Sequence, residues 1–92
     1  MADENLSLPT RTQILEEFAA AFRAMREVRK LTLDEIASRS GIKISKLERL
    51  ELGKYDPLLD DLLKLAKGFE MDAGEFVRLA LASATRPAGG DE

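Results

Sequence analysis

The stretch from residue 31 to 54, LTLDEIASRSGIKISKLERLELGK, constrains the fold more than any other part of the chain. It contains two short segments with apolar residues at every third or fourth position, which is the period of an amphipathic helix. Thr32 and Glu35 can form a capping box at the start of the first segment. Gly41 suits the left-handed position that ends it, and Ile42 then turns into the core. The stretch therefore predicts two short helices joined by a tight turn.

The chain before and within this stretch carries the same helical period, and no segment alternates as a strand would. Thr12 is the expected cap of a first helix whose apolar positions reach Val28. The second helix of the stretch, third in the chain, is expected over residues 44–52. Ser45 and Glu48 offer it a capping box, in competition with a start one or two residues earlier.

Two more helices are expected after Pro57, over residues 58–69 and over residues 73–83 with Asp72 as the cap. The inward positions of all five helices and of the turn predict one shared core. Its expected members are Phe18, Phe22, Met25, Ile36, Ala37, Ile42, Leu47, Leu50, Leu59, Leu62, Leu65, Ala66, Phe69 and Phe76.

The length of 92 residues suits one small domain, expected over residues 12–83. Residues 1–11 are expected to form a flexible arm, and residues 84–92 a disordered tail. The longest apolar runs are only a few residues, so contact with a membrane is not expected. The N-terminus carries acids where a signal peptide needs bases, which favours a cytoplasmic location.

Composition also limits the chemistry. The chain has no cysteine and no histidine. Thiolate and imidazole metal sites are therefore excluded, together with the commonest nucleophile and general base. No pair of acids is set in an apolar segment and no glycine-rich phosphate loop occurs. We expect a protein that is not an enzyme and that needs no metal or cofactor.

Four segments resemble the Cro/repressor-like helix-turn-helix family, also called the XRE family, over about residues 18–76. They are FRAMR, LTLDEIASRSGI, LERLELGK and DPLLDDLLKLAKGFEMDAGEF. The resemblance implies an all-α, five-helix lambda-repressor-like domain with disordered tails. It also implies that the third helix lies in the major groove of DNA. The residues placed toward DNA in that case are Lys43, Ile44, Ser45, Lys46, Arg49 and Lys54.

The sequence departs from the family pattern at positions that face DNA. Leu33 stands where members usually have an amide side chain, and Leu52 replaces the usual Asn or Arg. Ile44 takes the place of a polar reader, although isoleucine can touch a thymine methyl group. Leu58 occupies a position where a small polar residue is common. Leu33, Ile44 and Leu52 are expected to be exposed neighbours with a basic rim, a pattern typical of protein interfaces.

Two functions follow from these features. The first is a transcriptional regulator that acts by protein contact, similar to quorum-sensing antiactivators of the QseM type. Its partner would be a transcription factor, and binding to DNA would be weak or absent. The net charge of −3 favours this hypothesis. The expected partner-binding residues are Leu33, Ile44, Leu52, Leu58, Lys43, Lys46 and Arg49.

The alternative is a repressor that binds a specific operator as a dimer. A dimer needs a self-complementary surface. The last helix is expected to pack through Phe76 and Ala80, which would leave Val77 and Leu81 exposed as a second contact surface. The sequence does not decide between a monomer and a homodimer.

Overall fold

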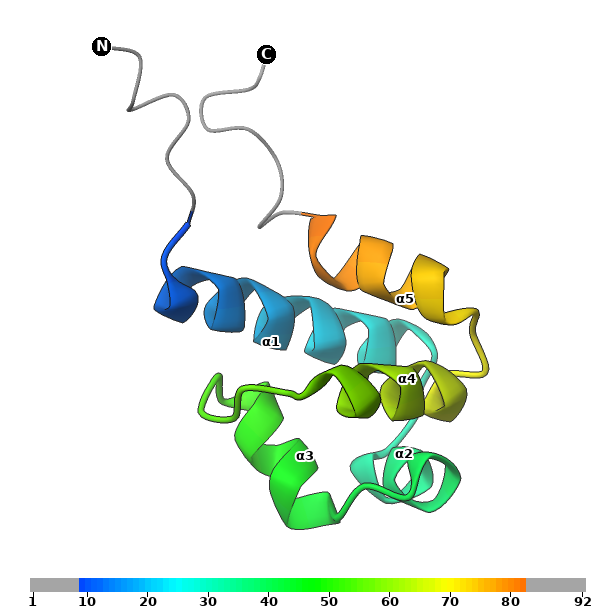
Figure 1. The fold of residues 1–92 in the computed structure, drawn as a ribbon. Coiled ribbons are helices and arrows are strands. Elements are labelled where there is room, and N and C mark those ends of the chain that lie inside the picture. The colour runs from blue at the N-terminus through cyan, green and yellow to red at the C-terminus, as the bar shows by residue number, and fades with distance from the viewer. Residues whose placement is uncertain (1–8, 83–92) are drawn as a thin grey trace, which may run out of the picture.

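The computed structural model describes residues 9–82, and in this range the chain forms five helices and no strand. Figure 1 shows α1 and α5 side by side, α2 and α3 at the opposite end of the molecule, and α4 between these two pairs. None of these helices has the length and apolar character needed to cross a membrane. The helices are α1 (Arg11–Val28), α2 (Leu33–Ser40), α3 (Ile44–Glu51), α4 (Leu59–Gly68) and α5 (Ala73–Ala80).

The centre of the core is a group of four phenylalanines from α1, α5 and the end of α4. Phe18 meets Phe76 edge-on with ring centroids 6.2 Å apart, and Phe22 meets Phe69 in the same way at 5.6 Å. Phe69 and Phe76 stack at 5.6 Å. Each such pair contributes about 0.5–1.5 kcal/mol beyond the burial of its area. The group therefore fixes α5 against both α1 and α4.

Most of the predicted core is confirmed. Ala37 and Leu62 are only partly buried, although both pack against the core. The predicted core residues that are buried are Phe18, Phe22, Met25, Ile36, Ile42, Leu47, Leu50, Leu65, Ala66, Phe69 and Phe76.

The prediction for Leu59 is wrong, since this side chain is 78% exposed. Leu59 is the first residue of α4, and Asp61 takes the inward position of the first turn. The buried stripe of α4 continues from there through Leu65 and Ala66. Leu59 lies at the edge of that stripe and faces solvent.

The helix starts agree with the sequence only in part. Thr32 and Glu35 form the predicted capping box of α2. The cap of α1 is Thr10 rather than Thr12, because Thr10 exchanges two hydrogen bonds with Gln13 in the same type of box. Of the predicted arm, residues 1–8 lie outside the described residues, as does the predicted tail at 84–92.

The turn between α2 and α3 has the predicted form. Gly41 ends α2 with φ of 81°, a left-handed conformation that glycine adopts without the strain of a side chain. Ile42 is buried directly after it. The start of α3 follows at once, with Lys43 as its cap residue. Ser45 is therefore already inside the helix, and the capping box predicted for it does not form.

Candidate functional site

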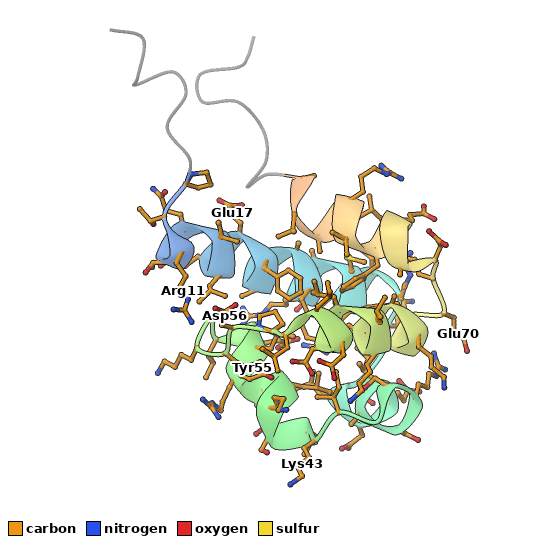
Figure 2. The ribbon with its side chains drawn as sticks, viewed as in Figure 1. Arg11, Glu17, Lys43, Tyr55, Asp56 and Glu70 are labelled. Atoms are coloured by element: carbon orange, nitrogen blue, oxygen red, sulfur yellow. The ribbon has the colours of Figure 1, made fainter. Side chains whose placement is uncertain are left out.

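The start of α3 faces solvent. Lys43, Ile44 and Ser45 are all exposed, and no side chain caps the first amides of the helix. In Figure 2, Lys43 projects from the tip of the molecule, away from α4 and α5. A helix N-terminus carries a partial positive charge and orients its amide donors outward. This tip can therefore accept an anionic group such as a phosphate.

Two further cations of α3 lie over one aromatic ring. The ammonium of Lys46 lies 5.1 Å from the ring centroid of Tyr55, and the guanidinium carbon of Arg49 lies 5.8 Å from it. Tyr55 belongs to the turn that follows α3. Lys54, the residue before it, is exposed. The predicted DNA-facing cations thus extend from the tip of α3 along its length.

The hydroxyl of Tyr55 donates a hydrogen bond of 2.6 Å to Oδ2 of Asp61. The backbone amide of Leu58 donates to the same oxygen at 2.9 Å. Burial by itself would raise the pKa of Asp61, but these two hydrogen bonds and the charges of Lys46 and Lys64 outweigh it and lower that pKa. The hydrogen bond to Asp61, together with burial, raises the pKa of Tyr55 above its ordinary value. Asp61 therefore stays ionised as the acceptor, and Tyr55 stays protonated as the donor.

The far end of α3 is tied to α1 by an ion pair. Both oxygens of the Glu51 carboxylate accept hydrogen bonds from Arg26, one from Nε and one from Nη2 at 3.2 Å. Nη1 of Arg26 donates to the carbonyl oxygen of Leu31 at 3.1 Å, so the same guanidinium also binds the turn between α1 and α2. The hydrogen bond to Glu51 raises the pKa of Arg26, although burial opposes the rise. Arg23 lies near the same carboxylate, at 3.8 Å.

Sequence reasoning missed both the Tyr55–Asp61 and the Arg26–Glu51 contacts. Each pair joins residues from two motifs that were recognised separately. The opposite charges in FRAMR and LERLELGK were a signal for the Arg26–Glu51 pair. Asp61, an aspartate at an inward position of α4, was a signal for the Tyr55–Asp61 pair, because a buried carboxylate needs a hydrogen-bond donor.

The apolar side chains predicted to face solvent at this surface are exposed only in part. Ile44 and Leu52 are exposed as predicted, at 37% and 62%, and Leu58 is exposed at 64%. The prediction for Leu33 is wrong, because this side chain is half-buried and packs against the core. Leu33 precedes Ile36 by three positions on α2, which places both on the inward stripe of the helix.

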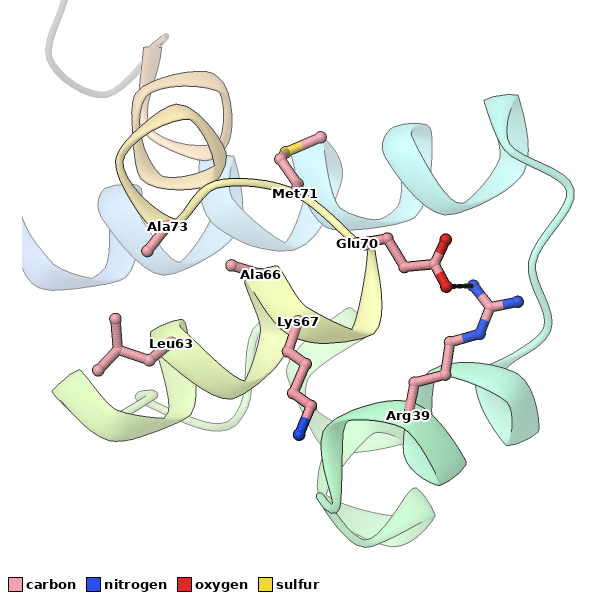
Figure 3. Close-up of a pocket in the computed structure, with 7 residues that line it drawn as sticks. All are labelled: Arg39, Leu63, Ala66, Lys67, Glu70, Met71 and Ala73. Atoms are coloured by element: carbon pink, nitrogen blue, oxygen red, sulfur yellow. Dashed lines mark ion pairs between the residues drawn. The ribbon is translucent and has the colours of Figure 1, made fainter.

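A second apolar surface was not predicted. On α4, Leu59 and Leu63 are exposed one turn apart. Leu63 also lines an open groove at the far end of α4, together with small apolar residues and charged side chains (Figure 3). At one side of this groove Arg39 forms an ion pair of 3.8 Å with Glu70. The full lining is Arg39, Leu63, Ala66, Lys67, Glu70, Met71 and Ala73.

The burial of two apolar side chains in and directly after α5 differs from the prediction. Phe76 and Ala80 are buried as predicted. Val77 and Leu81, which were predicted to be exposed, are partly buried and pack against the core. The reason is that α5 packs against both α1 and α4, so its apolar face is wider than that of a helix with one neighbour. These two residues therefore do not form the expected free contact surface.

Comparison with known proteins is consistent with this geometry. A sequence profile described as a helix-turn-helix domain matches residues 19–81. The chain belongs to the helix-turn-helix family. Over 58 residues, 62% of its length, this helix-turn-helix domain is 42% identical to the HTH-type transcriptional repressor RghR of Bacillus subtilis (strain 168).

A solved structure gives the same result for the fold. The crystal structure of an HTH_3 family transcriptional regulator from Vibrio cholerae matches 73% of this chain with a TM-score of 0.68 and 28% identity. The XRE-like, five-helix fold expected from the sequence is thereby confirmed. The chain spans 43% of the length of the Bacillus protein and 38% of the Vibrio chain.

Proposed function

We propose that this helix-turn-helix domain regulates transcription by binding DNA through the exposed face of α3. The observation that carries the proposal is the start of α3, which is exposed and has no side-chain cap, with Lys43 at its tip. The names of both matched proteins describe transcriptional regulators, and one is a repressor. Because the chain covers less than half of each, their activity is carried over here only as a proposal.

The chemistry of the exposed face suits a nucleic acid. Lys43, Lys46 and Arg49 can neutralise phosphates or donate to guanine. Ser45 can bond to more than one base, and Ile44 can contact a thymine methyl group. The partial burial of Leu33 also supports this proposal. Leu33 was expected to contact a protein partner together with Ile44 and Leu52, but it packs against the core instead.

The experiment is a titration of the domain with mixed-sequence duplex DNA at several salt concentrations. We expect a Kd of about 10⁻⁶–10⁻⁴ M at low salt, typical of nonspecific binding. Three cations at phosphates would give a slope of log K against log salt of about −2.7, from roughly −0.9 for each phosphate. Absence of binding at low salt would contradict the proposal.

A matched pair of variants tests which face is used. Lys43→Gln should reduce the steepness of the salt slope by about one unit, since one phosphate contact is removed. Arg78→Gln removes the same charge from α5, on the other side of the molecule (Figure 1), and should leave the slope unchanged. Equal effects of the two variants would mean that total charge, rather than α3, determines binding.

A second function is supported by the exposed leucines. In this case the domain binds another transcription factor, as an antiactivator does, through Leu52, Leu58 and Leu59. All three are more than 60% exposed. Apolar anchors of this kind dominate protein interfaces when they are buried. A wild type that binds no duplex, together with loss of regulatory activity in the Leu52→Asn, Leu58→Ser double variant, would favour this function over the first.

A further inference from the structure

We infer that Tyr55 is a positioning residue, which holds Lys46 and Arg49 of α3 in place before DNA is bound. This inference rests on the proposed function. Tyr55 lies outside α3, and Figure 2 shows it beside that helix and the start of α4. The Lys46 ammonium and the Arg49 guanidinium lie 5.1 Å and 5.8 Å from the centroid of its ring.

The arrangement depends on the spacing of the two cations. Lys46 and Arg49 are three residues apart, so they lie on the same side of the helix. Both can therefore interact with one ring, which attracts cations through its quadrupole within about 6 Å. Long side chains lose rotamer freedom when a ligand immobilises them, and this loss weakens binding. A ring that restricts the two side chains in the free protein reduces that loss.

The ring is itself fixed by α4. Its hydroxyl donates to Oδ2 of Asp61, a buried carboxylate that also accepts from the Leu58 amide. The start of α4 thus sets the place of Tyr55, and Tyr55 sets the place of Lys46 and Arg49. The hydroxyl anchors the residue on Asp61 and also interacts with Lys46, and the ring lies beside both cations.

Two variants separate the hydroxyl from the ring. Tyr55→Phe keeps the ring and removes the donor to Asp61. It should lower the stability of the domain to denaturant but keep the affinity for duplex DNA within about threefold of wild type. Tyr55→Leu removes the ring, and the affinity for mixed-sequence duplex at low salt should fall about tenfold. Ile36→Val, a core change remote from DNA, is the control for a loss of stability alone.

A measurement on the free protein makes the test independent of DNA. In wild type and Tyr55→Phe, the side-chain protons of Lys46 and Arg49 should show ring-current shifts in NMR spectra, and these shifts should vanish in Tyr55→Leu. The role of Tyr55 is overturned if wild type lacks the shifts, or if Tyr55→Leu binds duplex as well as wild type does. It is also overturned if Tyr55→Phe and Ile36→Val lose as much affinity as Tyr55→Leu. A wild type with the shifts but no affinity for duplex would instead overturn the proposed function, and with it the use of this arrangement on DNA.

Discussion

The two ends of α3 are held in different ways. At the C-terminal end, Glu51 is tied to Arg26 of α1 by two hydrogen bonds and is largely buried. At the N-terminal end, Lys43 and Ile44 are exposed and no side chain caps the helix. The helix therefore has a fixed base, its C-terminal end, and an open tip, its N-terminal end. The base positions the helix on the domain, and the tip is left with donors and charge for a ligand.

The inward side of α3 also fixes the helix to the domain. Truncating a side chain there should have the largest effect on stability. Leu47 has no exposed surface and belongs to the core, where α3 contacts α1 and α2. Leu47→Ala should lower the free energy of unfolding by about 2–5 kcal/mol, because it removes buried methyl groups and leaves a cavity. Chemical denaturation checks this. A change near zero would mean that α3 does not pack on the core through Leu47.

The ion pair at the base of α3 should have the next largest effect. Glu51→Gln removes the charge that accepts both hydrogen bonds from Arg26, and it leaves Arg26 partly buried without its counter-ion. We expect a loss of about 1–3 kcal/mol, below the range for a fully buried pair, since both groups keep some solvent contact. Glu48→Gln, at an exposed position of the same helix, is the matched control and should change stability by less than about 0.5 kcal/mol. Similar losses of stability in Glu51→Gln and Glu48→Gln would mean that the Arg26–Glu51 pair does not hold the base of α3 in place.

The buried carboxylate of Asp61, in the first turn of α4, should give a smaller effect that depends on pH. The pKa of Asp61 is lowered in the folded protein, so the ionised group stabilises the fold. This contribution is fully present above the pKa of an unfolded aspartate, about 4. It is lost as the pH falls through the lower pKa that Asp61 has in the folded protein. Asp61→Asn should cost about 1–2 kcal/mol at pH 7. Thermal unfolding of both proteins across pH should show that the difference shrinks in acid. A difference that is constant with pH would mean that ionised Asp61 does not stabilise the fold.

Changes to the exposed leucines should have the smallest effect on stability. The side chains of Leu52 and Leu58 are mostly in solvent. Leu52→Asn with Leu58→Ser should therefore lower the free energy of unfolding by no more than about 0.5 kcal/mol, since serine is also a favourable N-cap for α4. Calorimetry is a suitable measurement. A large loss would show that these side chains pack against the domain, which would remove the second proposed function as well.

Part of this arrangement could be predicted from the sequence alone. The inward faces of α2 and α3 follow the helical period, so Ile36, Leu47 and Leu50 were placed correctly. Leu33 was misplaced because its outward position was taken from the family pattern. Its spacing of three from Ile36 already placed it on the inward side of α2.

The contacts between elements were the harder part. The period of a helix identifies an inward side but not the partner on the other side. The Arg26–Glu51 pair joins positions 25 residues apart, and the Tyr55–Asp61 bond depends on how the turn after α3 folds. The start of α3 was likewise left open, because a capping box at Ser45 competed with a start one or two residues earlier, and the cap is Lys43. The exposed residues of the candidate site could be predicted from the sequence. The contacts that hold α3 in place, Arg26–Glu51 and Tyr55–Asp61, could not.

Binding of DNA at the tip of α3 is tested most directly by mapping which backbone amides respond to DNA. Two-dimensional NMR spectra of the labelled domain would be recorded during titration with duplex at low salt. If the tip of α3 binds DNA, the largest shift changes should cluster at residues 43–49, with smaller ones at Tyr55 and almost none on α5. Shift changes concentrated at residues 58–63, or none at any DNA concentration, would contradict the claim that the open tip of α3 is the surface that binds DNA.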